Sequence, residues 1–296
     1  MLWEIGLLTV FFFTYQLLAK LYQYTLRGPL DLQARYGVQS WALITGGSEG
    51  IGQAFAQLLA EWGFNVLLLA RSETKLKQTA AELRGKYPNV RVETVALDCY
   101  SCRNADFVQK LEEALRGKDL SVLVNNVGIS WGGDFLSMPL EQLLKEVVLC
   151  DEATLIVTKS LLPRLMDRAK RSGLVFNSGL TAIYPAPGLA VHSGTKAFEH
   201  YLADALQYEL RTKVDVLSLL PAAVCSSRLP ALRPNLIASS PADVAYGALR
   251  DLGQSYYSYG TLKHAVQAWG LAWTPRSLRL WALGRSVEYM VRHYGL

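Results

Sequence analysis

The chain has 296 residues, of which 51% are hydrophobic and only 19% charged, with a formal net charge of +5 and a mean hydropathy of +0.15. This length buries a sizeable core without cross-links, and the composition excludes a disordered, collagen-like or coiled-coil protein. Four cysteines are too few for a disulfide scaffold. The positive charge is concentrated near the C-terminus and no nucleic-acid-binding motif is present, so no nucleic-acid partner is expected.

The first predicted element is an apolar N-terminal segment. Residues 5–19 contain no charged side chain, and with their neighbours they approach the roughly 20 residues that cross a bilayer. Because charged residues interrupt the flanks, a buried core helix is the alternative. We predict a membrane anchor over residues 1–26, and the basic residues that follow it favour a main domain on the cytosolic or matrix side. The sequence leaves open whether the membrane is the endoplasmic reticulum or the inner mitochondrial membrane.

Short β-rich runs then alternate with helical patterns. The runs lie at residues 41–45, 65–70, 91–96, 121–125, 174–177 and 214–220. The helical patterns lie at residues 51–62, 73–84, 104–115, 141–168 and 190–212. Such alternation is typical of a parallel sheet covered on both faces, and right-handed crossovers make the sheet doubly wound. We predict an α/β Rossmann fold in one domain over residues 38–262, with ligands at the carboxyl ends of the strands.

A glycine-rich loop joins the first predicted strand to the helix that follows it. Glycines allow a tight turn and a close approach of the backbone to a diphosphate, while the start of the helix supplies free N–H groups and a positive dipole end. In this context the loop indicates a dinucleotide site, and a glycine turn without a ligand is the alternative. The residues expected to contact the cofactor are Thr45, Gly46, Ser48, Gly50, Ile51 and Gly52.

Arg71 follows the second predicted strand, where an NAD site usually carries an acidic residue for the ribose hydroxyls. A guanidinium instead suits a 2′-phosphate. A solvated surface arginine is the alternative. The sequence therefore favours NADP(H) over NAD(H) as the cofactor.

These features resemble the short-chain dehydrogenase/reductase family over about residues 40–262. Residues 45–52 are similar to its glycine loop, and residues 125–128 to its Asn-Asn-Ala-Gly element. The resemblance is closest to the membrane-bound branch of very-long-chain 3-oxoacyl-CoA reductases and 17-beta-hydroxysteroid dehydrogenases, and it implies reduction of a ketone by NADPH. The further cofactor-site residues that it implies are Asp98, Asn125, Pro221 and Ser226.

The catalytic residues implied by the resemblance are only partly present. The family uses Asn, Ser, Tyr and Lys; Lys196 is kept, and it also belongs to the expected cofactor site, but His192 stands at the Tyr position. Ser178 takes the Ser role if its loop is one residue longer than usual, and otherwise Gly179 occupies that position. Cys150 stands at the Asn position.

These changes lead to two functional hypotheses. An imidazolium is a competent acid near neutral pH, but Lys196 one turn away favours neutral imidazole, and the ring is shorter than a phenol. We therefore expect a protein that binds NADP(H), has lost most activity and serves a structural role, as a homodimer or a subunit of a membrane complex. The alternative is an active NADPH-dependent reductase of long-chain 3-oxoacyl-CoA or steroid ketones, with His192 or a water as the acid.

Two features remain. Cys99 and Cys102 form a C-x-x-C pair, but a second pair for zinc is missing, so reduced structural cysteines are expected rather than a redox pair, and no metal site is predicted. Residues 263–296 combine arginines with Trp and Leu. They predict a helical extension that either faces a membrane or packs on its own domain.

Overall fold

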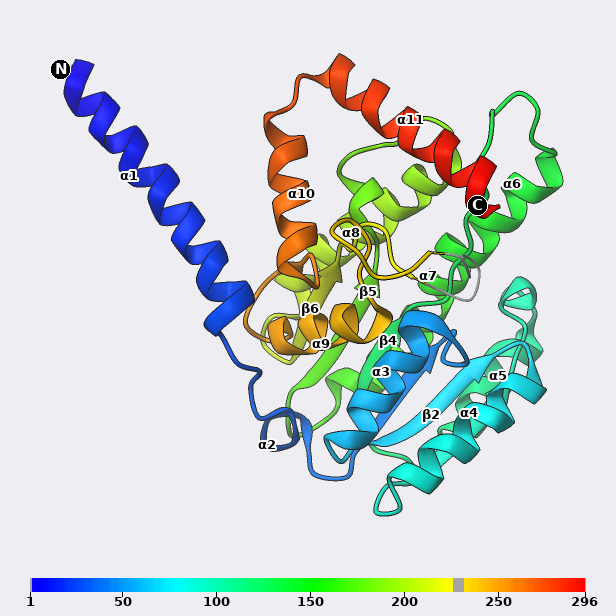
Figure 1. Ribbon diagram of the computed structural model, residues 1–296. Coiled ribbons are helices and arrows are strands. Elements are labelled where there is room, and N and C mark those ends of the chain that lie inside the picture. The colour runs from blue at the N-terminus through cyan, green and yellow to red at the C-terminus, as the bar shows by residue number, and fades with distance from the viewer. Residues whose placement is uncertain (1, 226–231, 296) are drawn as a thin grey trace.

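The computed structural model describes residues 2–225 and 232–295, and its centre is a seven-stranded sheet (Figure 1). All strand pairs are parallel, in the order β3-β2-β1-β4-β5-β6-β7. The predicted doubly wound Rossmann fold is confirmed. The strands are β1 (Trp41–Thr45), β2 (Asn65–Ala70), β3 (Val92–Ala96), β4 (Leu120–Asn125), β5 (Ser172–Asn177), β6 (Val214–Leu219) and β7 (Tyr257–Ser258).

The central strands are long apolar runs because both faces of the sheet are covered. On one face, Ile44 and Leu68 belong to a core that includes side chains of α3, α4 and α9. On the other face, Leu43 and Leu67 belong to a core with side chains of α5, α7 and α8. Adjacent residues of one strand thus enter opposite cores. The helices are α2 (Leu32–Tyr36), α3 (Gly50–Glu61), α4 (Glu73–Lys86), α5 (Ala105–Ala114), α7 (Ala153–Met166), α8 (Ala190–Leu210) and α9 (Pro241–Asp251).

The long helix predicted at residues 141–168 is interrupted. It consists of α6 (Leu140–Val147), a π-helical turn at Val148–Glu152 and then α7. A π turn inserts an extra residue into the helical repeat, and such turns are frequent at functional sites. Here the turn contains Cys150 and follows directly after Glu146, both of which are buried. The irregular turn thus lies beside two buried side chains, of which Glu146 contacts His192 of α8.

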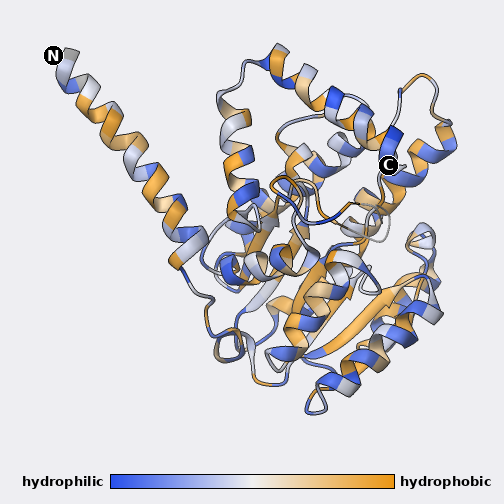
Figure 2. Ribbon diagram, viewed as in Figure 1, coloured by the Kyte–Doolittle hydropathy of each residue, from blue (hydrophilic) through white to orange (hydrophobic). Residues whose placement is uncertain are grey.

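The N-terminal helix α1 (Leu2–Leu21) projects away from the body of the molecule (Figure 1). Hydrophobic residues occur along its whole length (Figure 2), and side chains such as Trp3, Leu8 and Phe11 are exposed. The alternative of a buried core helix is therefore wrong. The predicted spanning anchor is not found either: across residues 2–225 and 232–295, no helix combines the length and apolar character needed to cross a membrane.

The chain ends in two helices, α10 (Leu262–Trp273) and α11 (Arg276–Tyr294), so the predicted C-terminal extension is helical. The Phe13 and Trp273 rings lie 5.1 Å apart, which places α1 beside α10. The Arg279 guanidinium lies 4.9 Å from the centre of the Tyr184 ring, and Val287 contacts the backbone at Gly188. The extension thus packs on its own domain along one side, while Trp269, Trp273 and Trp281 stay exposed.

Two buried carboxylates attach the N-terminal segment to the domain. Asp251, at the end of α9, accepts hydrogen bonds from Gln23, Arg27, Arg250 and Ser258. Asp215 of β6 accepts from the side chains of Arg35, Tyr36 and Arg171. Because each carboxylate joins segments that are distant in sequence, residues 22–36 are held against α9 and β6.

Candidate active site

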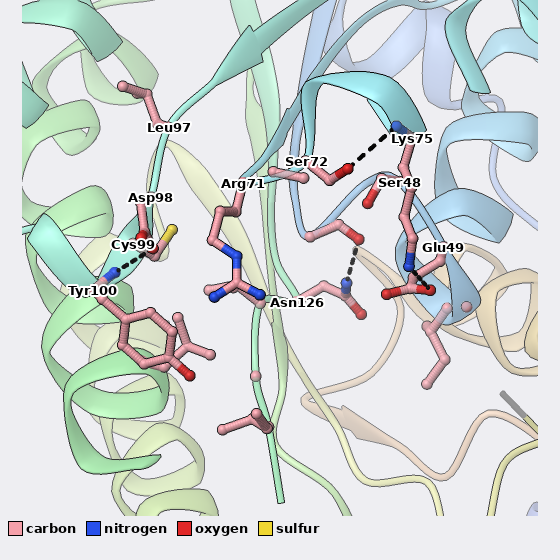
Figure 3. Close-up of a pocket in the computed structure, with 18 residues that line it drawn as sticks. Ser48, Glu49, Arg71, Ser72, Lys75, Leu97, Asp98, Cys99, Tyr100 and Asn126 are labelled. Carbon is pink, nitrogen blue, oxygen red and sulfur yellow. Dashed lines mark hydrogen bonds and ion pairs between the residues drawn. The ribbon is translucent and has the colours of Figure 1, made fainter. Parts of the chain in front are cut away.

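A cleft of about 420 Å³ opens at the carboxyl ends of β1, β2, β3 and β4. It lies where the strand order reverses between β1 and β4, which is the usual ligand position in an open α/β sheet. The walls come from the glycine loop, from the segments after β2 and β3, and from the segment after β4 (Figure 3). The position agrees with the ligand site predicted from the alternation of strands and helices.

The glycine loop is shaped so that its backbone can approach a ligand. Gly46 and Gly50 have φ angles of +65° and +60°, which favour glycine. At Gly52, a Cβ atom would lie 2.2 Å from the carbonyl oxygen of Gly46, so no other residue fits there. Helix α3 begins at Gly50, with Ser48, Gly50 and Ile51 lining the cleft. The cradle and the free N–H groups of the helix start fit the diphosphate of a dinucleotide.

A hydrogen-bond network holds the loop to the central strands. The Thr45 hydroxyl accepts from the backbone N–H groups of Asn126 and Val127, at 2.9 and 3.0 Å. The Asn126 side chain donates to the Thr45 carbonyl at 3.0 Å and accepts from the Asn177 amide at 3.0 Å. Thr45 is therefore a support of the loop rather than a lining residue of the cleft. Asn126, which lines the cleft, was not among the predicted site residues, although it belongs to the recognised 125–128 element.

Two basic side chains, Arg71 and Lys75, are among the residues that line the cleft. The Arg71 side chain extends into the cleft between Tyr100 and Asn126 (Figure 3), with its guanidinium 5.9 Å from the centre of the Tyr100 ring. Lys75 also lines the cleft, at the start of α4, and its ammonium lies 2.9 Å from the Glu49 carboxylate. Sequence reasoning found Arg71 and missed Lys75, because one lysine in a charged helix carries no distinctive signal. Arg71 and Lys75 together suit a phosphate on the ribose.

Asp98 lines the cleft after β3, where its carboxylate accepts from the backbone N–H of Tyr100 at 3.1 Å. This bond shapes the short turn that contains Cys99 and Cys102. Both cysteines are buried and free. Burial raises the pKa of the Cys99 thiol to about 12. These thiols are thus packed in the core, and no metal-binding cluster occurs within residues 2–225 and 232–295.

Three predicted cofactor residues need separate comment. The Asn125 amide donates to the Thr158 hydroxyl at 2.8 Å and is buried against α7, so its side chain does not face the cleft. Pro221 is buried, and its carbonyl accepts from the backbone N–H of Leu180 at 2.8 Å, which places Pro221 beside the segment after β5. Ser226 lies outside the described residues.

Lys196 lies on α8 and is buried, with its ammonium donating to the Asn177 carbonyl at 2.9 Å. The same ammonium lies 2.9 and 3.0 Å from the two carboxylate oxygens of Glu199, one turn along the helix. Burial lowers the pKa of Lys196, but Glu199 and its other anionic neighbours outweigh this effect and raise it. Lys196 is therefore a paired cation in this structure.

His192 lies one turn before Lys196 on the same helix. Its Nδ1 is 2.9 Å from the Oε1 atom of Glu146 on α6. Burial is the largest effect on its pKa and lowers it, while the hydrogen bond to Glu146 opposes that shift. Sequence reasoning did not single out Glu146 as a partner of His192, because the two residues lie on separate helices and no motif links them.

Of the remaining predicted catalytic residues, Cys150 lies close to Lys196, because both side chains approach Gly128, whereas Ser178 is bonded elsewhere. The Ser178 hydroxyl is buried and lies 3.2 Å from the Ser218 hydroxyl, so it is engaged away from His192. A Cβ atom on Gly179 would lie 3.9 Å from the Cγ atom of Lys196. Gly179, which has no hydroxyl, is therefore near the stem of the Lys196 side chain. Cys150 donates to the Ile129 carbonyl at 3.6 Å, and burial raises the pKa of its thiol to about 11.

This fold, with a glycine-loop cleft at the reversal of strand order and a buried lysine near its inner end, is that of a dinucleotide-dependent oxidoreductase. The model of the short chain dehydrogenase family matches residues 40–235. The chain belongs to this family, which confirms the resemblance drawn from its motifs.

Curated relatives agree with the family assignment. A protein of Pyricularia oryzae named very-long-chain 3-oxoacyl-CoA reductase is 35% identical over 245 residues, covering 80% of this chain and 73% of the relative. A human protein of the same name is 33% identical over 235 residues, covering 78% and 74%. The chain is thus similar to reductases of this name over most of both lengths.

Solved structures agree with the fold. A short-chain dehydrogenase from Sphingobium yanoikuyae in complex with NADPH is 26% identical, with a TM-score of 0.64 and coverage of 72% of this chain and 84% of that one. A 7beta-hydroxysteroid dehydrogenase has a TM-score of 0.77 at 20% identity, covering 86% and 99%, which shows the fold alone. The family and the cleft together support a nucleotide cofactor.

Proposed function

We propose that this chain is an NADP(H)-dependent oxidoreductase that acts on the keto group of a long-chain 3-oxoacyl thioester, with His192 as the proton-transfer residue. The observation that supports activity most is the hydrogen bond between His192 and the buried Glu146, which keeps one ring nitrogen engaged and the imidazole orientation fixed. The names of the curated relatives support the substrate class.

The roles of the binding residues follow from the cleft. The glycine loop and the start of α3 receive the diphosphate, and Arg71 with Lys75 receives a 2′-phosphate, which favours NADP(H) over NAD(H). When bound, NADPH supplies the hydride. His192 supplies the proton to the carbonyl oxygen, and Lys196 maintains positive charge near the ribose and the proton-transfer group.

A dinucleotide-binding protein without turnover is the second candidate, and one observation favours it. The ammonium of Lys196 is engaged by Glu199, and the position beside it is a glycine, so two catalytic contributions typical of the family are altered. In that case the chain acts as a homodimer or as a subunit of a larger assembly. The names of the relatives give this structural role no support.

The two candidates are separated by measuring NADPH binding and turnover on the same purified chain. NADPH is titrated by fluorescence, and its oxidation is followed with long-chain 3-oxoacyl-CoA. The proposed function requires binding together with turnover that His192→Ala and Lys196→Ala reduce. Tight binding with turnover no faster than that of both variants would reject the enzyme and favour the structural role.

We also propose that the exposed apolar surface on α1, α10 and α11 contacts a lipid bilayer. The helices α10 and α11 carry exposed Trp side chains and the exposed Arg276, Arg285 and Arg292. A basic surface with aromatic residues is typical of segments that lie on a membrane. Flotation of the chain with vesicles that contain anionic lipids tests this proposal. Flotation of wild type that is lost in the Trp269→Ala, Trp273→Ala, Trp281→Ala triple variant supports the proposal. If neither the wild type nor the triple variant floats with the vesicles, the proposal is contradicted.

A further inference from the structure

We propose that Glu146 is a positioning residue for the reaction: it fixes the tautomer and the orientation of His192, so that Nε2 of the imidazole exchanges the proton with substrate. This inference rests on the proposed function, because it concerns the same proton transfer. It differs from that proposal in naming a second residue, on a different helix, through which the imidazole becomes competent.

The geometry of the pair supports this role. Glu146 Oε1 and His192 Nδ1 are 2.9 Å apart, and the Glu146 side chain is 1% exposed while that of His192 is 18% exposed. The carboxylate is therefore enclosed, and the imidazole is the more exposed of the two side chains. The second carboxylate oxygen, Oε2, is buried and has no hydrogen-bond partner within the described part of the chain. Burial of a carboxylate with a single hydrogen-bond partner costs folding free energy. We infer from this cost that the contact is kept because it orients the imidazole of His192.

The chemistry of the two groups fixes the tautomer. A carboxylate only accepts hydrogen bonds, so the proton of the contact must lie on Nδ1. In neutral His192, Nε2 then carries a lone pair, and in the imidazolium form it carries the transferable proton. The hydrogen bond also prevents rotation of the ring, which keeps Nε2 directed away from Glu146. Orientation of this kind matters because a misplacement of about 1 Å costs about 100-fold in rate.

The proton balance of the step is simple. The carbonyl carbon is reduced by hydride from bound NADPH, which is oxidised to NADP⁺, while the carbonyl oxygen takes the proton of Nε2 and becomes a hydroxyl. His192 is left as neutral imidazole, with Nδ1–H still donated to Glu146. In the reverse direction, neutral Nε2 takes the proton of the alcohol. No further reactant is needed.

The charges around His192 set the pH at which each direction works. Glu146 faces the imidazole from α6, and Lys196 lies one turn along α8. The anionic or ionisable neighbours of Lys196 are Glu199 on α8 and, in the π turn, Cys150 and Asp151. Burial and Lys196 lower the pKa of His192, and Glu146 opposes them. Reduction needs the imidazolium and therefore slows as pH rises through this pKa. Oxidation of the alcohol needs neutral imidazole and therefore speeds up over the same range.

The pH dependence of kcat/KM for reduction tests the role of Glu146. In Glu146→Gln, the amide keeps the shape, but it removes the negative charge and can donate as well as accept. We expect kcat/KM near neutral pH to fall by about 100-fold, with the descending limb moved to lower pH and the Kd for NADPH unchanged. Glu141→Gln is the matched control, because Glu141 is on the same helix but 79% exposed in a surface pair with Lys145. An unchanged rate and pH profile in Glu146→Gln would overturn the inference.

A double-mutant cycle separates positioning from structural support. If Glu146 acts through the imidazole, Glu146→Gln has no further effect in a His192→Ala background. Equal effects in both backgrounds would overturn the inference while leaving the proposed function intact. If wild type itself shows no turnover above His192→Ala although it binds NADPH, both the proposed function and the inference fail.

A measurement on unmodified protein covers the case in which Glu146→Gln does not fold. Nitrogen NMR of the wild-type imidazole distinguishes the two neutral tautomers. We expect the proton of His192 on Nδ1 at a pH above its pKa. A proton on Nε2 would overturn the inference, because the carboxylate would then not fix the tautomer.

Discussion

Residues at the two ends of the site match the pattern implied by the family resemblance to different degrees. The residues of the glycine loop and Asp98 all occupy positions that suit a dinucleotide, and Arg71 adds a charge for a phosphate. At the inner end, the resemblance implies Tyr and Asn where the chain has His192 and Cys150, and a Ser at Ser178 or at Gly179. The imidazole of His192 is paired with a carboxylate on another helix.

Arg71 is predicted to determine the choice between NADPH and NADH. In Arg71→Ala, a charge-assisted hydrogen bond of about 1.5–3 kcal/mol to the 2′-phosphate is lost, so the Kd for NADPH should rise about 10- to 100-fold. The Kd for NADH should change little, because NADH has no phosphate there. Titration of both nucleotides gives the answer. Lys77→Ala, an exposed lysine of α4 paired with Glu73, is the control, and equal weakening of both nucleotides by Arg71→Ala would contradict the prediction.

Gly52 is predicted to tolerate no side chain. In Gly52→Ala, the new methyl would overlap the Gly46 carbonyl, so the loop must move; we expect a loss of about 1–3 kcal/mol in the free energy of unfolding and much weaker NADPH binding. Gly85→Ala is the matched control, because Gly85 lies in helix α4 with nothing within 4 Å of a built Cβ. That change should stabilise the helix by about 0.5–1 kcal/mol. Urea unfolding measures the free energy of unfolding of both variants. If Gly52→Ala leaves this free energy and NADPH binding unchanged, the loop has another conformation.

At the scale of elements, periodicity predicted the central strands well because both faces of each strand are buried. The six predicted strands correspond to β1–β6 within a few residues. The strand β7 was missed because it has only two residues, Tyr257–Ser258, and its pairing with β6 depends on tertiary structure. Helix α9 was missed as well, although Ser240 caps it and Pro241 lies in its first turn. The π turn was not predictable, since its hydrophobic pattern continues that of α6 and α7.

The candidate site divides in the same way. The glycine loop is local in sequence, so a dinucleotide site could be predicted from its glycines and from its place between a strand and a helix. The two charged pairs of the site could not be predicted from local sequence. His192 and Glu146 lie on different helices. Lys196 and Glu199 lie on one helix, but their burial depends on the packing of α8 against the sheet. The hydrogen-bond partners of the Ser178 and Asn125 side chains could not be predicted either, because Ser218 and Thr158 are distant in sequence.

Asp251 is predicted to stabilise the junction between the N-terminal segment and α9. Burial raises its pKa, but hydrogen bonds from Arg250 and Ser258 outweigh this and lower it below the ordinary value. Its contribution is therefore present above about pH 4 and is lost as pH falls through the lower pKa of the folded state. Asp251→Asn should lose about 3–5 kcal/mol near neutral pH, because buried arginines keep no counterion.

Thermal unfolding of wild type and Asp251→Asn between pH 7 and strongly acidic pH measures this contribution. The difference between their melting temperatures should shrink on acidification. Asp106→Asn, which removes an exposed pair with Lys110, is the control and should change stability by less than about 1 kcal/mol. A difference for Asp251→Asn that is independent of pH would show that its charge is not the stabilising feature.

At the scale of the whole molecule, the high hydrophobic content of the sequence has two sources. One is the core on both faces of the sheet, and the other is the set of exposed apolar side chains on α1, α10 and α11. Hydrophobic residues recur along the ribbon of α1 (Figure 2). The extension over residues 263–296 both packs on the domain, through Arg279 and Val287, and presents Trp side chains outward. The two alternatives drawn from the sequence for this extension are therefore not exclusive.

Single turnover of the preformed NADPH complex tests the central claim most directly. The complex is mixed with a long-chain 3-oxoacyl-CoA, and the loss of NADPH absorbance is recorded for wild type and for His192→Ala at equal saturation with NADPH. The account predicts oxidation of bound NADPH in wild type and a rate at least about 100-fold lower in the variant, because a positioned proton donor contributes 10²–10⁴-fold. Equal rates in the two proteins, or no oxidation in either, would contradict it.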